Sequence, residues 1–277
     1  MSTLTPFPDM APVPRILVDV PVAEFPAGSV TVSLTRTSEG RTMQVRGGQR
    51  LPATSPAIVI DAEAGFGIES AYTVLGHDAS GAIIGSWPIG SAVLSFDQVV
   101  IQQPLDPRLA VVVAKLSGTG AELVRETPGE PAWPQGSALP GVIALGPRRG
   151  LDGVELELMV DSHEAADILQ ASLGTYERRQ LPIWLIRTPP GRRLPAVFFC
   201  HVPRLREKDE LIQLGLTRVL YSAVVTETKP PAAGITAAVL THSDMKVFFA
   251  THTQVKALYA THSDVKRDMS LIGAASA

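Results

Sequence analysis

Short segments in which apolar and polar residues alternate dominate the first hundred residues. In the clearest one, a period of two directs Val30, Val32 and Leu34 to a core. Thr31 and Ser33, between them, are expected to face solvent. Similar segments separated by Gly- and Ser-containing turns predict strands at residues 15–20, 29–37, 42–46, 57–61, 70–78 and 82–87. The pattern is typical of half-buried antiparallel sheet.

About seven short strands in about ninety residues is the pattern of an Ig-like or fibronectin-type-III-like sandwich, which we predict over residues 15–101. The stretch 71–81 resembles the penultimate strand and final hairpin of a fibronectin type III module, with Tyr72 at the position of its tyrosine. Residues 1–14 contain prolines and no positive charge, so we expect a flexible or extended arm and not a secretory signal.

A linker is predicted at residues 102–107, Q-Q-P-L-D-P, because each proline removes a donor from a strand ladder. The following unit, residues 108–230, has one helix that starts near Asp161 and Glu164 and ends at Gly174. Its predicted strands are 110–116, 139–145, 154–160, 182–187, 196–202 and 216–226, with a Pro- and Gly-rich excursion at 127–140. This order predicts an α+β unit built on antiparallel sheet.

Residues 231–277 contain a ten-residue repeat, with blocks that begin at Thr241, Thr251 and Thr261. Each threonine is an N-cap candidate with Asp or Gln three positions later, which predicts a helix of about two turns. An apolar stripe is expected in the first two blocks from Met245, Phe248, Phe249, Val255, Leu258 and Tyr259. Helices this short are not stable alone in water, so we expect them to dock on a neighbouring subunit or another protein.

Composition narrows the classes of function. The chain of 277 residues has 24 Lys and Arg against 27 Asp and Glu, a net charge of −3, which does not favour a general nucleic-acid binder or a basic membrane-surface protein. Charged residues make up only 18%, which indicates that other subunits cover part of the surface. Cys200 is the only cysteine, so an intramolecular disulfide and a thiolate-rich zinc site are excluded.

Candidate chemistry is sparse. The His163-Glu-Ala-Ala-Asp167 segment has two potential metal ligands but no evident third, so a polar first helical turn is the favoured interpretation. His242, His252 and His262 recur with the repeat, and repetition alone explains them. Neighbouring Cys200 and His201 are expected to point to opposite faces of a strand. Loop acids Asp61, Glu63, Glu69 and Asp78 are expected to be solvated.

Arginine pairs on turns are the remaining candidates, and we interpret them as contacts to partner subunits: Arg148 and Arg149, Arg178 and Arg179, and Arg192 and Arg193. The sequence contains no P-loop, no G-x-G-x-x-G after a strand and no G-x-S-x-G elbow. We therefore expect neither an enzyme nor a cofactor or metal.

Three segments together resemble minor tail proteins of long-tailed bacteriophages of actinobacteria, in particular those like the distal tail protein. They are the strands from Val30 and Tyr72, the segment L139-P-G-V-I-A-L-G-P-R-R-G-L-D-G-V-E-L-E-L-M-V with its following helix, and the Thr-initiated decapeptides. The family often has Thr-Trp where this chain has Thr-His.

The resemblance implies a structural virion protein in the tail tip, without enzymatic activity. It implies a homo-oligomer, a ring of six formed by residues 108–230, joining the tail tube protein to hub, tip and host-recognition proteins. DNA would pass through the ring without sequence-specific contacts, and the chain would assemble in the host cytoplasm without a membrane. The alternative is a carbohydrate-binding or adhesin module, for which the first unit offers only Phe66 and Trp87 as loop aromatics.

Overall fold

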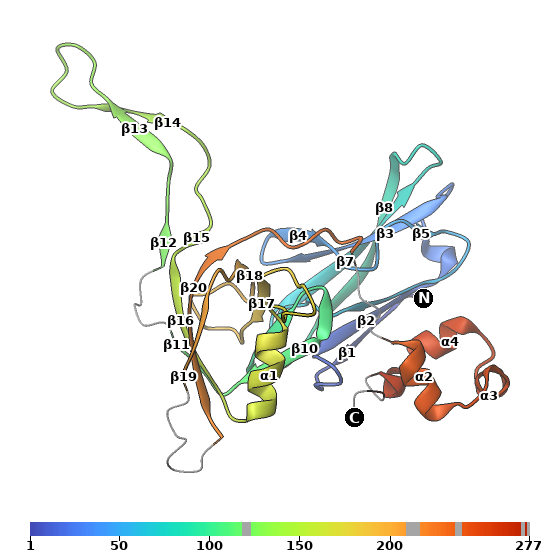
Figure 1. Ribbon diagram of the computed structural model, residues 1–277. Helices are drawn as coiled ribbons and strands as arrows, with labels where there is room; N and C mark the ends of the chain where they lie inside the picture. The colour runs from blue at the N-terminus through green and yellow to red at the C-terminus, as the bar shows by residue number, and fades with distance from the viewer. Residues whose placement is uncertain (118–122, 209–216, 236–239, 273–274, 276–277) are drawn as a thin grey trace.

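The protein is mainly β, as predicted, with many antiparallel strands and four α-helices in the described part of the chain (Figure 1). The computed structural model describes residues 1–117, 123–208, 217–235, 240–272 and 275. No helix among the described residues is long and apolar enough to span a membrane.

The first unit consists of two sheets that face each other across one core. One has the order β1 (Thr3–Phe7), β2 (Arg15–Val20) and β6 (Ala57–Asp61). The other has the order β4 (Arg41–Gln44), β3 (Thr31–Ser38), β7 (Glu69–His77) and β8 (Ile83–Val93), with β5 (Leu51–Pro52) also beside β3. Val18 and Val59 of the first sheet share the core with Leu34 and Val74 of the second.

Two details of the predicted alternation are wrong. Val30 precedes β3 and is 53% exposed, because the strand begins only at Thr31. Ser33 is 2% exposed, since the loop at Arg50 covers it. Its hydroxyl accepts a hydrogen bond from the Arg50 amide at 3.1 Å and lies 2.9 Å from His77 Nε2, so the buried hydroxyl of Ser33 is itself satisfied.

The prediction of a flexible or extended arm at residues 1–14 also needs correction. Thr3–Phe7 forms β1, which pairs with β2 over its whole length, from Thr3 opposite Asp19 to Phe7 opposite Arg15. Arg15 is 2% exposed, and its guanidinium lies 5.1 Å from the Phe7 ring centroid. The N-terminal segment is therefore an edge strand of the first unit.

The second unit is a single sheet that curls around its core. Its order is β10 (Asp106–Val113), β9 (Val99–Gln103), β17 (Ile183–Arg187), β18 (Val197–His201), β20 (Val219–Glu227), β16 (Val154–Val160) and β11 (Lys115–Ser117), with β19 (Leu205–Lys208) also paired to β20. The edge strands β10 and β11 are consecutive in the chain, and Ala114 between them donates from its backbone N to Met159 O at 2.9 Å. The two edges of the sheet thus meet.

Helix α1 (His163–Ala171) lies against this core, as the sequence predicts. Its N-cap is Ser162 and not Asp161, because the Ser162 hydroxyl accepts from Ala165 N at 3.1 Å whereas Asp161 pairs with Arg218 at 3.1 Å. Gly174 follows in a left-handed conformation with φ of 99°. Residue 216, where the last predicted strand begins, lies outside the described residues.

The predicted linker at residues 102–107 is wrong. Gln102 and Gln103 end β9 and are fully buried, and Asp106 starts β10, so the segment is the turn of a hairpin inside the second sheet. Pro107 is accommodated because the β9–β10 register shifts between Asp106 and Ala110. The second unit therefore begins by Val99, and no linker separates the two cores.

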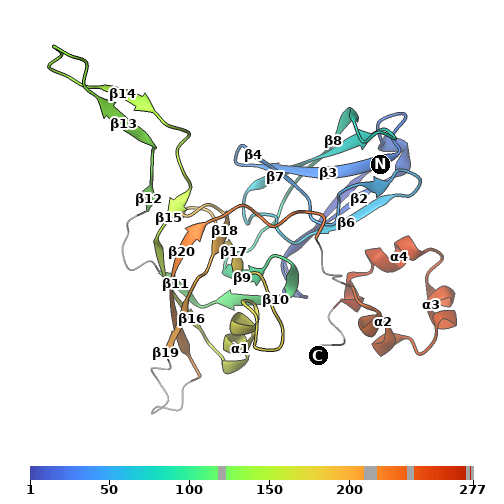
Figure 2. The same ribbon diagram turned by 45° about the horizontal axis from the view of Figure 1, so that its top comes forward.

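A long arm, residues 124–152, projects from the second unit (Figures 1 and 2). Its base is β12 (Val124–Arg125) paired with β15 (Leu151–Asp152), and its outer part is β13 (Gly129–Ala132) paired with β14 (Gly141–Ala144). The predicted strand at 139–145 therefore exists as β14, but it lies outside the main sheet.

The two units are joined through Arg187, at the end of β17. Its guanidinium donates to Pro14 O at 2.8 Å, Ala64 O at 3.1 Å and Gln102 Oε1 at 2.8 Å. It also lies 4.4 Å from the Phe66 ring centroid. Burial lowers the pKa of Arg187 to about 9, so the side chain stays protonated at neutral pH. The first unit is therefore held to the second by direct contacts, which a domain separated by a linker would lack.

Replacing this guanidinium tests its role in joining the units. The Arg187→Ala substitution should lower the free energy of unfolding by about 2–4 kcal/mol, because it leaves a cavity and three unpaired buried acceptors. Denaturant unfolding measures the change. Arg204→Ala, at an exposed position between the strands β18 and β19, is the control and should change it by less than about 0.5 kcal/mol. Equal losses in both variants would contradict this role.

Candidate functional site

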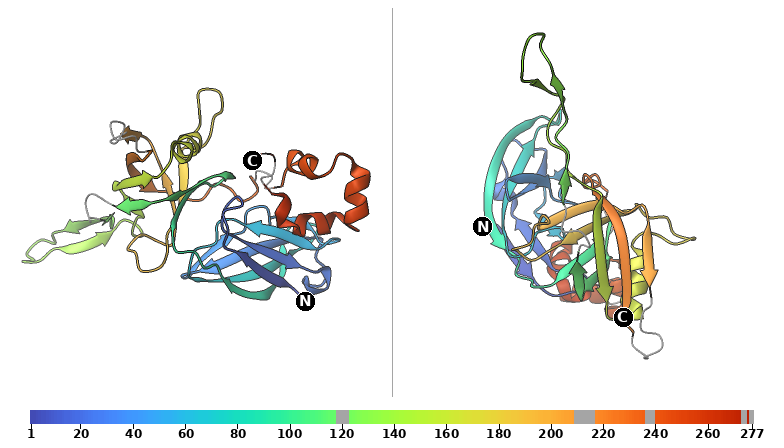
Figure 3. Two further views of the ribbon diagram at one scale, coloured as in Figure 1. Left: turned by 90° about the horizontal axis from the view of Figure 1, so that it is seen from below. Right: turned by 90° about the vertical axis from the view of Figure 1, so that its left-hand side faces the viewer.

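The arm has an apolar surface that its own paired strands do not bury. Six of its large apolar side chains are between 48% and 77% exposed: Val124, Trp133, Leu139, Val142, Ile143 and Leu145. Figure 3 shows the arm as a narrow ribbon standing clear of both units. An isolated two-stranded hairpin is at best marginally stable in water, and clustered exposed apolar residues mark interaction sites. The arm therefore has the properties of a protein-binding surface.

The predicted arginine candidates lie on separate elements. Arg148 and Arg149 are exposed near the base of the arm, where Arg149 forms an ion pair with Glu126 across the two strands. Arg192 and Arg193 are exposed on the turn between β17 and β18. These two pairs therefore do not belong to one basic site. Arg178, of the third predicted pair, instead binds Asp106 of this chain at 3.1 Å.

The C-terminal repeats fold as predicted, into α2 (His242–Phe248), α3 (His252–Leu258) and α4 (His262–Arg267). In each block the threonine and the third residue of the helix form a capping box. A turn η3 (Met269–Leu271) follows, and Ala275 N donates to Asp244 Oδ1 at 3.0 Å. The chain thus returns to α2 and closes the arc seen in Figure 2. We call residues 240–272 and 275 the C-terminal module.

The predicted apolar stripe of these helices divides into two faces. Met245, Phe249, Val255 and Tyr259 are half-buried, and the Phe249 and Tyr259 rings meet edge to face at 6.0 Å. Phe248 and Leu258 are 52% and 66% exposed. The reason is that each helix ends one residue before Phe249 or Tyr259, whose extended backbone turns the side chain away from the helical stripe.

The last block and η3 pack on this chain's own first unit. Met269 and Ile272 form a buried cluster with Leu17 of β2, against Ile58 and Ile60 of β6. Arg267 Nε lies 2.6 Å from Asp19 Oδ2. The expectation that the repeats require another protein is therefore wrong for this part. The signal was present in Ala57–Asp61, where successive apolar residues indicate a sheet covered on both faces.

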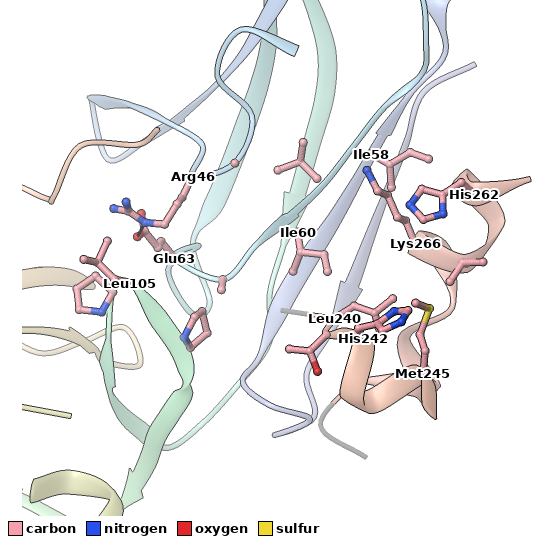
Figure 4. Close-up of a pocket in the computed structure, with 17 residues that line it drawn as sticks. Arg46, Ile58, Ile60, Glu63, Leu105, Leu240, His242, Met245, His262 and Lys266 are labelled. Atoms are coloured by element: carbon pink, nitrogen blue, oxygen red, sulfur yellow. Dashed lines mark hydrogen bonds and ion pairs between the residues drawn. The ribbon is translucent and has the colours of Figure 1, made fainter. Parts of the chain in front are cut away.

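A hollow of about 440 Å³ separates α2 and α4 from β6 and from the turn after β9 (Figure 4). Ile58, Ile60 and Met245 form part of its apolar lining, with His262 and Lys266 on the side of the module. Arg46 and Glu63 line the opposite end and pair at 2.7 Å. The pocket therefore lies beside the surface of the first unit on which the module packs.

Arg46 also binds the segment that leads to the module. Its guanidinium donates to the carbonyls of Pro231 at 3.0 Å, Ala232 at 2.8 Å and Ile235 at 2.8 Å. Burial raises the pKa of Glu63, its carboxylate partner, while the charge of Arg46 opposes that shift. Sequence reasoning missed this contact because it joins residues far apart in the chain.

Two of the predicted loop acids are buried. Asp61 is 1% exposed and accepts from Arg36 of the opposite sheet at 2.6 Å and from the Tyr72 hydroxyl at 2.8 Å. Burial opposes ionisation of Asp61, but the charge of Arg36 holds its pKa below the usual value. Glu63 is 5% exposed, whereas Glu69 and Asp78 are not buried. The expectation of solvated loop acids is therefore wrong for Asp61 and Glu63.

The other candidate residues do not form a reactive cluster in the described part of the chain. Cys200 is fully buried, and burial raises the pKa of its thiol, while neighbouring His201 is exposed. The rings of His242 and His252 lie 5.5 Å apart between centroids. Among the described residues, no group of three or more His, Cys, Asp or Glu is arranged to hold a metal ion.

Compared with known proteins, the sequence matches no family model and shows no significant similarity to a curated protein. Its surfaces are therefore the basis for any proposal about function.

The caps of the module predict that acid unfolds it. Hydrogen bonds from the Thr261 and Ser270 hydroxyls are the largest cause that lowers the pKa of Asp264 and Asp268, respectively. The unfolded chain then takes up protons more readily, so the stabilisation is complete above about pH 4 and is lost as the pH falls through the folded pKa values. NMR signals of 241–270 followed against pH should disappear from the folded positions first. Asp264→Asn should weaken this pH dependence, and an unchanged dependence would contradict the explanation.

Proposed function

We propose that the protein is a structural subunit of a bacteriophage tail tip, in a ring that joins the tail tube to tip and host-recognition proteins. The observation that carries the proposal is the exposed apolar arm at residues 124–152, which requires a partner. In this proposal the first unit is a fibronectin-III- or Ig-like sandwich, and the second is the ring-forming, distal-tail-like domain. The partners are further copies, six to a ring, together with the tube protein and the hub or tip proteins.

The positions of the candidate contacts are consistent with a closed ring. A ring requires each subunit to bind its neighbour through two different surfaces. The arm with Arg148 and Arg149 offers one, and the turn with Arg192 and Arg193 belongs to another element. The ring would lie in the virion tail, with DNA passing through it, after assembly in the host cytoplasm.

A carbohydrate-binding or adhesin module is the alternative, and the first unit supports it less well. Sugar sites generally present exposed aromatic rings, and of the two aromatics considered only Trp87 is exposed, at 54%. Phe66 is fully buried beneath Arg187 and therefore cannot contact a glycan.

The mass of the purified protein at micromolar concentration tests the ring. We expect oligomers of ring size or longer polymers of such rings. A monomer at every concentration that binds a glycan would overturn the proposal and favour the alternative.

Polar substitution on the arm should prevent assembly without unfolding the subunit. In the double variant Leu139→Ser and Val142→Ser, two side chains that are 76% and 77% exposed lose their apolar surface. We expect the dissociation constant of the oligomer to rise at least about tenfold, since each buried large apolar residue contributes about 1.5–3 kcal/mol. Sedimentation equilibrium measures this constant, and the melting temperature of the subunit should not change.

The control is Tyr176→Ser, which removes another fully exposed side chain from the second unit, outside the arm. It should assemble like the unmodified protein. Equal weakening by both changes would contradict a specific role for the arm.

A further inference from the structure

The C-terminal module is held together by its own contacts and is joined to the rest of the chain by one connecting segment. Its helices carry their own capping boxes, the Phe249 and Tyr259 rings join α2 to α3, and the Tyr259 hydroxyl donates to Asp268 after α4. Ala275 closes the arc on Asp244. Residues 228–235 lead to the module without helix or strand. The module can therefore move as a unit.

The seat of the module, which is the face of the first unit on which it packs, combines one apolar cluster with one ion pair. Within the described residues, α4 and η3 contact β2 and β6, and Arg267 pairs with Asp19. Leu240 of the module and Phe7 of β1 pack against the same cluster. Beside it lies the solvent-open hollow of about 440 Å³ drawn in Figure 4. Val247, Phe248 and Leu258 of α2 and α3 are left exposed. The seat therefore covers only part of the apolar surface of the module.

The contacts of the seat do not depend on which copy supplies the sheet. Met269 and Ile272 would meet Leu17 in the same way on a neighbouring chain, and Arg267 would meet Asp19. Exchange of an identical element between copies costs little, because only the connecting segment changes course. Arg46 holds that segment through backbone carbonyls alone, and once released a dozen residues can span roughly 40 Å.

We propose that in the assembled ring the C-terminal module of each chain seats on the first unit of the neighbouring copy. The partner is thus a second copy of this chain, and its docking surface is the face of β2 and β6 that carries Leu17, Asp19, Ile58 and Ile60. This inference rests on the proposed ring. Exchange gives each pair of subunits a second, tethered contact in addition to the arm.

Charge reversal distinguishes exchange from seating on the same chain. Asp19→Arg and Arg267→Asp each place like charges at the seat in both arrangements. In a mixture of the two variants, exchange restores one native pair and one reversed pair, whereas seating on the same chain restores neither. The chain carrying both substitutions regains a pair in either arrangement and is the folding control.

The measurement is hydrogen exchange of residues 241–270 in the full chain, together with the mass of the assembly. Each single variant should lose at least about tenfold in protection, because like charges oppose docking and an unseated module opens locally more often than a docked one. An equimolar mixture should regain protection in those positions. The double variant should behave like the unmodified protein.

The outcomes separate the two proposals. If the protein assembles and the double variant recovers but the mixture does not, the exchange is overturned and the ring stands. If the unmodified chain stays monomeric at every concentration, both are overturned. Full protection in the single variants would also overturn the exchange, because the Asp19–Arg267 pair would then not belong to the seat.

Discussion

One buried guanidinium, that of Arg187, determines how the two halves of this protein are arranged. Arg187 lies on strand β17 of the curled sheet. Its guanidinium donates to the carbonyls of Pro14 and Ala64 in the first unit and to the side chain of Gln102 near the start of the second. A charge without solvent must find several acceptors at fixed positions, so the contact tolerates little displacement. The first unit, the hairpin of β9 and β10, and β17 are therefore held as one body. The arm and the module extend from this body on different sides (Figure 1).

Local patterns were sufficient to predict much of the fold. The strands Arg15–Val20, Ala57–Asp61 and Val154–Val160 have the predicted bounds, because apolar alternation and turn residues act over a few positions. The capping boxes of the three repeats follow from the same kind of local hydrogen bonding.

The errors share a cause, which is contact between residues distant in sequence. Gln103 is buried because its amide donates to the Ser172 and Leu181 carbonyls, and Asp61 because Arg36 lies opposite it on the other sheet. The pattern of apolar and polar residues predicts neither set of hydrogen-bond partners. The excursion predicted at residues 127–140 is part of the arm, but the strand at 139–145 was wrongly assigned to the main sheet. Its apolar residues favour a core, yet β14 has no sheet of this chain to join except β13. Sequence patterns therefore identify the apolar side chains that need to be buried, but not the surface that buries them.

The closed arc of the repeats has a consequence for how such chains vary. Because the chain returns to α2 only after three blocks and η3, a tandem duplication of one decapeptide would have to widen the arc or open the contact between Ala275 and Asp244. Insertions of ten residues, or of multiples of ten, would keep every cap and ring contact in phase, whereas any other length would break the stack. Related chains should therefore differ in this region by whole blocks.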